Sequence, residues 1–201
     1  MVFEQVKSDR MGNFSYIIVD EGTKEAAIVD PSFSSEKLIR LAVSRGLNVK
    51  YVIDTHSHLD HTYGNEAVAS RFGAKVVAHK NALIEKDMPV DDGDVLSLGN
   101  TKILVIYTPG HTNDGICLLM DKKLLTGDTL FVGECGHTRD GNAQDMYHSL
   151  FDKLAKLPDD IEIYPGHDYG PRPSSTMGLE KHTNYVLENR TLGEFVEFMK
   201  E

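Results

Sequence analysis

Apolar residues recur along this chain in short runs that are separated by polar turns and by segments of helical spacing. Three pairs of runs flank a short polar turn and predict β-hairpins, at 14–19 with 26–29, 95–98 with 102–107, and 116–120 with 123–125. Single runs at 49–53, 75–78 and 161–164 predict further strands, of which 161–164 is the last.

Segments with apolar residues at helical spacing lie between these strands. The predicted helices are one that begins at Ser34 or Ser35 and ends before Gly46, and those at 65–72, 145–157 and 178–187. Thr191 and Glu194 have the spacing of a capping box, which predicts a final helix with Phe195, Phe198 and Met199 facing inward. Residues 81–94 are acidic and less regular, and we expect a short helix and a loop bordering the site there.

Hairpins and helices are mixed in two successive halves, which predicts two sheets rich in antiparallel pairs with helices outside. The expected fold is therefore an α/β four-layer sandwich, αβ/βα, with two mixed sheets flanked by helices. A length of 201 residues suits one domain, so we expect residues 1–201 to form a single domain with a short helical C-terminal end.

Residues 55–61 read Thr-His-Ser-His-Leu-Asp-His and bring together four candidate metal ligands, namely His56, His58, Asp60 and His61. Burying that many polar groups without partners costs roughly 1–3 kcal/mol each. A divalent cation removes this difficulty, because imidazole and carboxylate are common ligands of zinc, iron and manganese. The alternative is a solvated loop that is merely rich in histidine.

Three more candidate ligands each follow a predicted strand, namely His111, Asp128 and His167. Active sites in layered α/β folds collect in the loops beyond strand ends, where a rigid sheet holds residues from distant segments together. The ordered set therefore predicts a metal site. Asp54, just before the heptapeptide, is a candidate for orienting a ligating imidazole, with a structural cap as the alternative.

Charge and composition narrow the function. The chain has 21 basic and 31 acidic side chains and no basic cluster, which argues against nucleic acid as a partner. No apolar run is long enough to span a membrane, and no signal peptide is evident, so we expect a cytoplasmic protein. Cys117 and Cys135 form no metal or disulfide pattern, and we expect both to be structural, as we do His79. Two further histidines, His148 and His182, are expected on solvated faces.

The His-x-His-x-Asp-His motif, followed by Gly-His111, Gly-Asp128 and Gly-His167, resembles the metallo-β-lactamase superfamily over essentially the whole chain. Segments 126–132, 141–147 and 164–169 are similar to the branch that holds hydroxyacylglutathione hydrolase (glyoxalase II) and the persulfide dioxygenases. The resemblance implies the metallo-β-lactamase fold and two divalent ions of zinc, iron or manganese. His56, His58 and His111 would hold one ion, Asp60, His61 and His167 the other, and Asp128 would bridge them.

For the hydrolase reading, the resemblance implies that a metal-bound hydroxide attacks a thioester and that Asp60 positions or deprotonates the water. The alternative is a persulfide dioxygenase, in which one Fe(II) is held by His56, His111 and Asp128. A non-catalytic metal-binding protein would need a missing ligand or a closed coordination shell, and the sequence lacks no ligand.

Departures from the family bear on the substrate. Glyoxalase II carries a C-terminal helical extension, whereas only residues 169–201 follow Asp168 here. The family's basic residue after Cys-Gly is replaced by His137, with Arg139 two positions on, while Tyr169 matches a family tyrosine. The resemblance therefore implies a small thiol-carrier substrate, glutathione or another thiol, contacted by these three residues. A homodimer is compatible with this reading.

Overall fold

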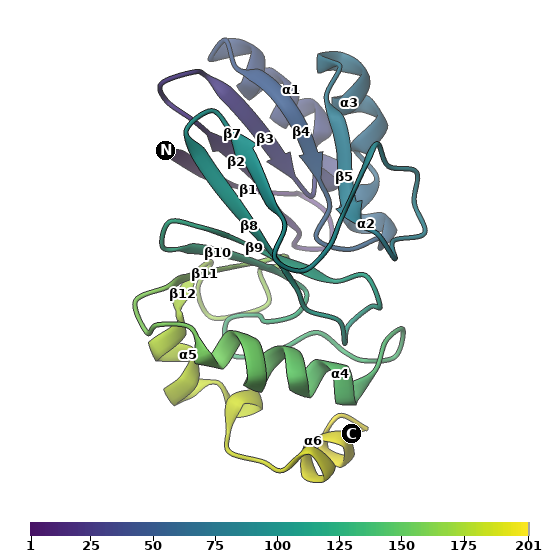
Figure 1. The fold of residues 1–201 in the computed structure, drawn as a ribbon, viewed down its shortest axis with the longest axis vertical. Coiled ribbons are helices and arrows are strands. Elements are labelled where there is room, and N and C mark those ends of the chain that lie inside the picture. Colours follow the sequence, from purple (N-terminus) through teal and green to yellow (C-terminus); the bar gives the residue numbers. More distant parts are fainter. Residues whose placement is uncertain (201) are drawn as a thin grey trace.

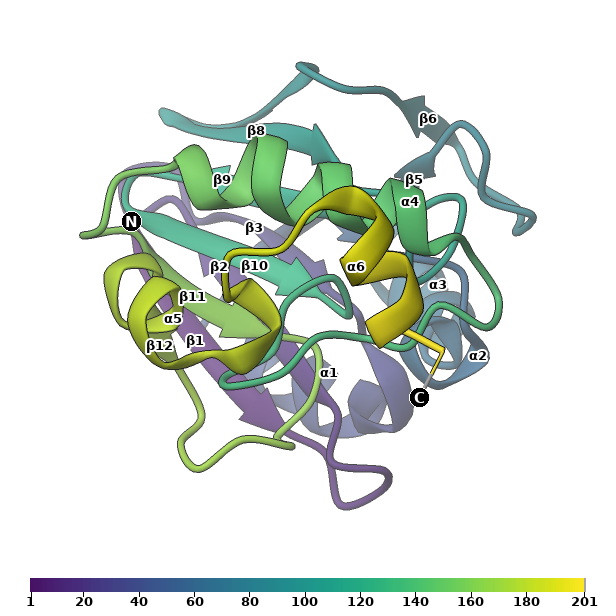
Figure 2. The same ribbon diagram turned by 90° about the horizontal axis from the view of Figure 1, so that it is seen from below.

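Two six-stranded β-sheets pack face to face, and helices cover the outer face of each (Figure 1). This computed structural model describes residues 1–200. The helices on the first sheet are α1 (Ser35–Ser44) and α3 (Asn65–Phe72), and those on the second are α4 (Ala143–Tyr147), α5 (Met177–Thr183) and α6 (Leu192–Phe198). Figure 2 shows the second group of helices lying across the second sheet. The predicted four-layer sandwich is confirmed.

The first sheet follows chain order and consists of β1 (Val2–Lys7), β2 (Phe14–Val19), β3 (Glu25–Val29), β4 (Asn48–Ile53), β5 (Lys75–His79) and β6 (Met88–Val90). The second also has neighbours in chain order, from β7 (Val95–Leu98) through β8 (Thr101–Tyr107), β9 (Ile116–Met120), β10 (Lys123–Gly127) and β11 (Glu162–Pro165) to β12 (Ser175–Thr176). The antiparallel prediction holds for the second sheet, where only β10 and β11 are parallel.

The first sheet is mixed, as predicted, but it is less rich in antiparallel pairs than expected. Strands β1, β2 and β3 are joined by antiparallel pairs, while β3, β4, β5 and β6 are joined by parallel pairs. Helices α1 and α3 lie in the crossover connections of the β3–β4 and β4–β5 pairs, whereas residues 80–87, which connect β5 to β6, form no helix. The spacing of apolar residues predicted these two helices. Whether the strand after each helix runs parallel or antiparallel to its neighbour depends on which strand it pairs with, and the sequence alone does not show that.

Three apolar cores lie between the four layers, and the alternation along β2 shows how they form. Tyr16 and Ile18 face the core between the two sheets, while Ile17 faces the core beneath α1 and α3. Since both faces of this strand are covered, all of its residues are buried. The third core joins the second sheet to α4 and α6, through residues such as Leu124 and Phe195.

Several short elements differ from the predictions. The 81–94 region forms strand β6 rather than a helix, because Met88–Val90 pair with β5. Strand β12 follows β11, so the run at 161–164 is not the last strand. Edge strand β1 and the single-turn helix α2 (Leu59–Thr62) were not predicted, because neither has a clear spacing of apolar residues. Such short elements depend on contacts with the rest of the fold more than on local propensity.

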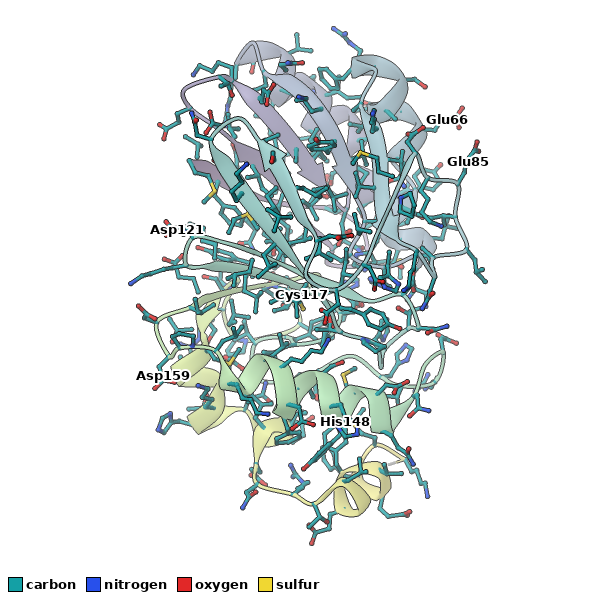
Figure 3. The ribbon with its side chains drawn as sticks, in the orientation of Figure 1. Glu66, Glu85, Cys117, Asp121, His148 and Asp159 are labelled. Atoms are coloured by element: carbon teal, nitrogen blue, oxygen red, sulfur yellow. The ribbon has the colours of Figure 1, made fainter. Side chains whose placement is uncertain are left out.

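The C-terminal helical layer follows the predictions closely. Helix α4 begins at the Asn142 cap and continues through a π-helical stretch, His148–Lys153, into a 3₁₀ turn. Thr191 and Glu194 form the predicted capping box of α6, whose Phe195 is fully buried. Figure 3 places Cys117 within the interior and His148 on the outer helical layer. Among residues 1–200, no helix is both long and apolar enough to cross a membrane.

Candidate metal centre

All seven predicted ligands converge at one edge of the sandwich, in the loops that follow strands of both sheets. His56 and His58 follow β4, while Asp60 and His61 lie on α2 directly after them. The second sheet contributes the other three from the segments that follow β8, β10 and β11, namely His111, Asp128 and His167. The strand-end rule used on the sequence therefore gives a single spatial cluster.

Three imidazoles form the first group of this cluster. His58 Nδ1 lies 3.1 Å from His56 Nε2 and 3.0 Å from His111 Nε2. The three nitrogens can all face one point, and together they make a tripod open to a cation. His58 is the most exposed of the three, with 31% of its side chain accessible to solvent.

A carboxylate and two imidazoles form the second group. His61 Nε2 lies 3.2 Å from His167 Nε2. Asp60 Oδ2 lies 3.3 Å from His167 Nε2 and 3.5 Å from His61 Nε2. Asp60 is the most exposed member, at 18%, and it therefore faces the open side of the cleft.

Asp128 lies between the two groups. Its Oδ2 is 3.5 Å from His111 Nε2 in the first group and 3.3 Å from His167 Nε2 in the second. Its Oδ1 is 3.4 Å from His61 Nε2 and is buried without a hydrogen bond. A buried carboxylate with donors on both sides is suited to contact two cations at once.

Hydrogen bonds on the outer side of the His111 and His167 rings determine which ring nitrogen faces the cluster. His111 Nδ1 donates to the carbonyl oxygen of His137 at 2.8 Å, and His167 Nδ1 donates to that of Met11 at 3.0 Å. Since a carbonyl only accepts, each neutral ring carries its proton on Nδ1 and directs an unprotonated Nε2 inward. The inward nitrogens of these rings and the Asp60 and Asp128 carboxylates together form the kind of donor set that a metal ion binds.

Asp30 orients two further ligands, and our reading of the sequence missed it. Its Oδ2 lies 3.0 Å from His61 Nδ1 and accepts from Thr55 Oγ1 at 2.6 Å, while its Oδ1 accepts from the Thr55 amide. Thr55 Oγ1 in turn lies 3.2 Å from His56 Nδ1. Asp30 directly follows β3, so the strand-end rule could have found it.

Of the two roles considered for Asp54, the structure favours the structural one. Asp54 Oδ2 accepts from Asn65 Nδ2 at 2.7 Å, and its Oδ1 has no hydrogen bond among the described residues. The carboxylate therefore anchors the start of α3, and the orienting role proposed for it belongs to Asp30. Burial raises the pKa of Asp54 well above its ordinary value, with Asp30 adding to the effect.

In the metal-free protein, the candidate ligands shift one another's pKa values. Burial would lower the pKa of His61, but Asp128 and Asp30 raise it well above its ordinary value. Despite burial, bonds to Asp128 and Asp60 raise the pKa of His167 to about 9. Burial lowers the pKa of His56, and the charge of His61 lowers it further. A cation that binds here must therefore displace protons.

Two glycines allow these loops to approach one another closely. A Cβ atom at Gly166 would lie 2.3 Å from Asp128 Oδ1, and one at Gly136 would lie 2.1 Å from the Asp128 carbonyl oxygen. A side chain at Gly166 would displace the Asp128 carboxylate, and one at Gly136 would displace the Asp128 main chain. The glycines before His167 and after Cys135 are thus required by close packing around Asp128.

The predicted substrate residues lie on two adjoining cavities. His137 and Tyr169 line the ligand cleft, a cavity of about 170 Å³, and the Tyr169 ring stacks on His167 at 4.5 Å. Arg139 does not line that cleft. It lines a neighbouring cavity of about 670 Å³, which shares Gly136 and His137 with the cleft and is closed by the end of α6.

The remaining histidines and cysteines lie outside the ligand set. His79 stacks on Tyr107, and His148 pairs with Asp152. His182 bonds to a carbonyl oxygen one turn back on its own helix. Cys135 lines the larger cavity, and burial raises the pKa of its thiol to about 12. These positions agree with structural or surface roles.

Comparison with known proteins defines the class to which this fold and cluster belong. The sequence model described as "Metallo-beta-lactamase superfamily" matches residues 9–167. The chain belongs to the metallo-beta-lactamase superfamily, as its motifs predicted.

Individual relatives cover the chain to different extents. Hydroxyacylglutathione hydrolase from Maricaulis maris is 39% identical over 162 residues, which are 78% of this chain and 62% of that protein. The probable polyketide biosynthesis zinc-dependent hydrolase BaeB from Bacillus velezensis is 30% identical, over 92% of this chain and 86% of that protein. ETHE1 from Myxococcus xanthus matches in structure with a TM-score of 0.95 and 33% identity, covering 100% of this chain and 91% of that one. The chain thus spans about 62% of the length of the first of these relatives.

Proposed function

We propose that this protein is a hydrolase of the glyoxalase II type that binds two divalent metal ions and cleaves thioesters. The observation that carries the proposal is the position of Asp128 Oδ2 between His111 Nε2 and His167 Nε2, at 3.5 and 3.3 Å. Each side of that oxygen has its own set of three donors. A single ion would leave one of these sets without a role.

When bound, two divalent ions supply a hydroxide nucleophile near neutral pH and polarise a carbonyl group. The chain's own part is to hold the ligands rigidly and to admit the substrate. In this proposal Asp60, on the open side of the cleft, orients a water molecule or accepts its proton. The relative named as a zinc-dependent hydrolase supports zinc as the metal.

The substrate class follows from the cleft's size and rim. A cavity of about 170 Å³ holds little more than the reacting thioester, so the thiol carrier must extend outward. Tyr169, 60% exposed beside His167, offers a ring against which the carrier can lie. His137 and Arg139 lead into the larger cavity, where Arg139 can pair with an anionic group of the carrier. We propose a small thiol such as glutathione as the carrier, and the cytoplasm as the site of action.

A second candidate is a dioxygenase that oxidises a persulfide with one Fe(II) held by His56, His111 and Asp128. His111 Nε2 and Asp128 Oδ2 lie 3.5 Å apart, which suits two ligands of one ion. Two histidines and one carboxylate form the usual triad of non-haem iron oxygenases. The likeness to ETHE1 over 91% of that chain leaves this candidate open.

One assay series separates the two proposals. Protein loaded with zinc, manganese or iron is given a panel of acyl-thiols, and thiol release is followed. In parallel, iron-loaded protein is given glutathione persulfide in an oxygen electrode. Thiol release that depends on metal supports the hydrolase. Oxygen consumption without thioester cleavage would overturn it in favour of the dioxygenase.

A further inference from the structure

A buried amide that is not itself a candidate metal ligand lies beside the ligand cluster. Asn13, at the end of the loop between β1 and β2, is 0% exposed. Its Nδ2 donates to Asp60 Oδ2 at 2.9 Å and lies 3.5 Å from His167 Nε2. Asn13 therefore contacts the same carboxylate oxygen that faces His61 and His167.

The backbone holds this amide in a fixed place relative to His167. Asn13 forms an antiparallel bridge with His167. The residues on either side are tied as well, because the Phe14 amide donates to the Gly166 carbonyl and the Asp168 amide donates to the Gly12 carbonyl, both at 2.8 Å. The side chain therefore approaches Asp60 from a rigid support and not from a free loop.

Stability alone does not account for an asparagine at this position. Asn13 Oδ1 is buried and has no hydrogen-bond partner among residues 1–200. An unsatisfied buried oxygen destabilises a fold, whereas an apolar side chain of similar size would leave no polar atom unpaired. Only the donor half of the amide is used, and its acceptor is Asp60.

We infer that Asn13 is a positioning residue that directs Asp60 Oδ2 toward the second metal ion. Asp60 is the most exposed ligand of its group, and no other side chain among the described residues donates a hydrogen bond to it apart from the ligand imidazoles. Without Asn13, the carboxylate is free to rotate about its side-chain torsions into the open cleft. This inference rests on the proposed two-metal function.

The test is a zinc titration of metal-free protein against a chromophoric chelator, comparing wild type with Asn13→Leu. We expect the affinity of the second site to fall about 10-fold, the range typical for partners that orient a ligand. The first site, formed by His56, His58 and His111, should be unchanged. The Tm of the metal-free variant should be equal to or higher than that of wild type, since an unpaired oxygen is removed.

Asn184→Leu is the matched control, because Asn184 is also buried but bonds to Glu180 and to the Phe131 and Glu134 carbonyls, none of which is a candidate ligand. It should lower Tm and leave both zinc affinities as in wild type. Asn13→Ala serves the same test if the leucine variant does not fold.

An unchanged second-site affinity in the Asn13 variants would overturn the inference. So would an equal loss at both sites with a lower Tm, which indicates a purely structural role, and so would a wild type that binds a single ion. The titration needs no substrate, so failure of the thioester assay alone would refute the hydrolase and leave the positioning role standing.

Discussion

Asp30 Oδ2 lies 3.0 Å from His61 Nδ1, and both side chains are almost completely buried. The carboxylate thereby fixes the proton of His61 on Nδ1 and turns Nε2 toward the ligand cluster. Because Thr55 links the same carboxylate to His56, one residue outside the cluster orients a ligand from each of the two groups.

Asp30→Asn should therefore disrupt metal binding without removing any ligand. If the amide oxygen keeps its bond to the Thr55 N–H, the amide nitrogen faces His61 and forces that ring to accept at Nδ1. The proton then moves to Nε2, where the metal should bind. We expect metal affinity to fall about 10- to 100-fold. Zinc content after dialysis measures this.

Asp20→Asn is the control for that variant. Asp20 is also a buried carboxylate that accepts from Thr23 and Thr101, but it lies in the hairpin between β2 and β3. Its variant should keep full zinc content. Equal loss of zinc from both variants would show that the Asp30 effect is only general destabilisation.

Gly166→Ala should displace Asp128, since the new methyl group would lie 2.3 Å from its Oδ1. We expect loss of bound metal and of activity, together with a lower Tm. Gly193→Ala is a suitable comparison, because a Cβ atom there meets nothing within 4 Å and alanine favours helix α6 by about 0.5–1 kcal/mol. Full metal content in Gly166→Ala would refute the close packing that we describe.

His167→Ala distinguishes the two proposed functions. Asp128→Ala should abolish metal binding and activity under either, because the carboxylate is a ligand in both schemes. His167 is a ligand only in the two-metal scheme, so its loss should disable the hydrolase and only weaken a one-iron dioxygenase. Thiol release by the purified variant is the measurement, and wild-type rates would contradict the two-metal scheme.

Zinc should stabilise the protein more at high pH than at low pH. In the metal-free protein the pKa of His167 is raised to about 9 from 6.5, so its stabilising contribution is complete below pH 6.5 and is lost as the pH rises through 9. Zinc requires the deprotonated ring, so its binding strengthens over the same interval. Tm with and without zinc at pH 6.5 and pH 9 tests this, and a gain that shrinks toward pH 9 would contradict it.

Much of the fold and the ligand cluster could be predicted from the sequence, because the chemistry is concentrated in short motifs at strand ends. The heptapeptide around His58 and the glycines before His111 and His167 are local signals. The hairpins and the capping box at Thr191 are equally local, since turn and cap residues act within a few positions.

What the sequence did not reveal depends on contacts between distant segments. Asn13 acts on a residue 47 positions away, and nothing in its own neighbourhood marks it. Asp30 does follow a strand end, but its partner His61 lies 31 positions away, so the sequence alone does not pair the two. Of the two readings of Asp54, the structural one fits its bond to Asn65, while the orienting role falls to Asp30, which was not considered from the sequence. Strand β6 likewise exists only because β5 provides its partner.

The most direct test of the two-metal proposal is elemental analysis of the protein purified without added metal, counting zinc, iron and manganese per chain. We predict close to two ions per chain, as two sets of donors joined by Asp128 require. Close to one iron per chain, with little of any other metal, would contradict the two-metal site and favour the dioxygenase.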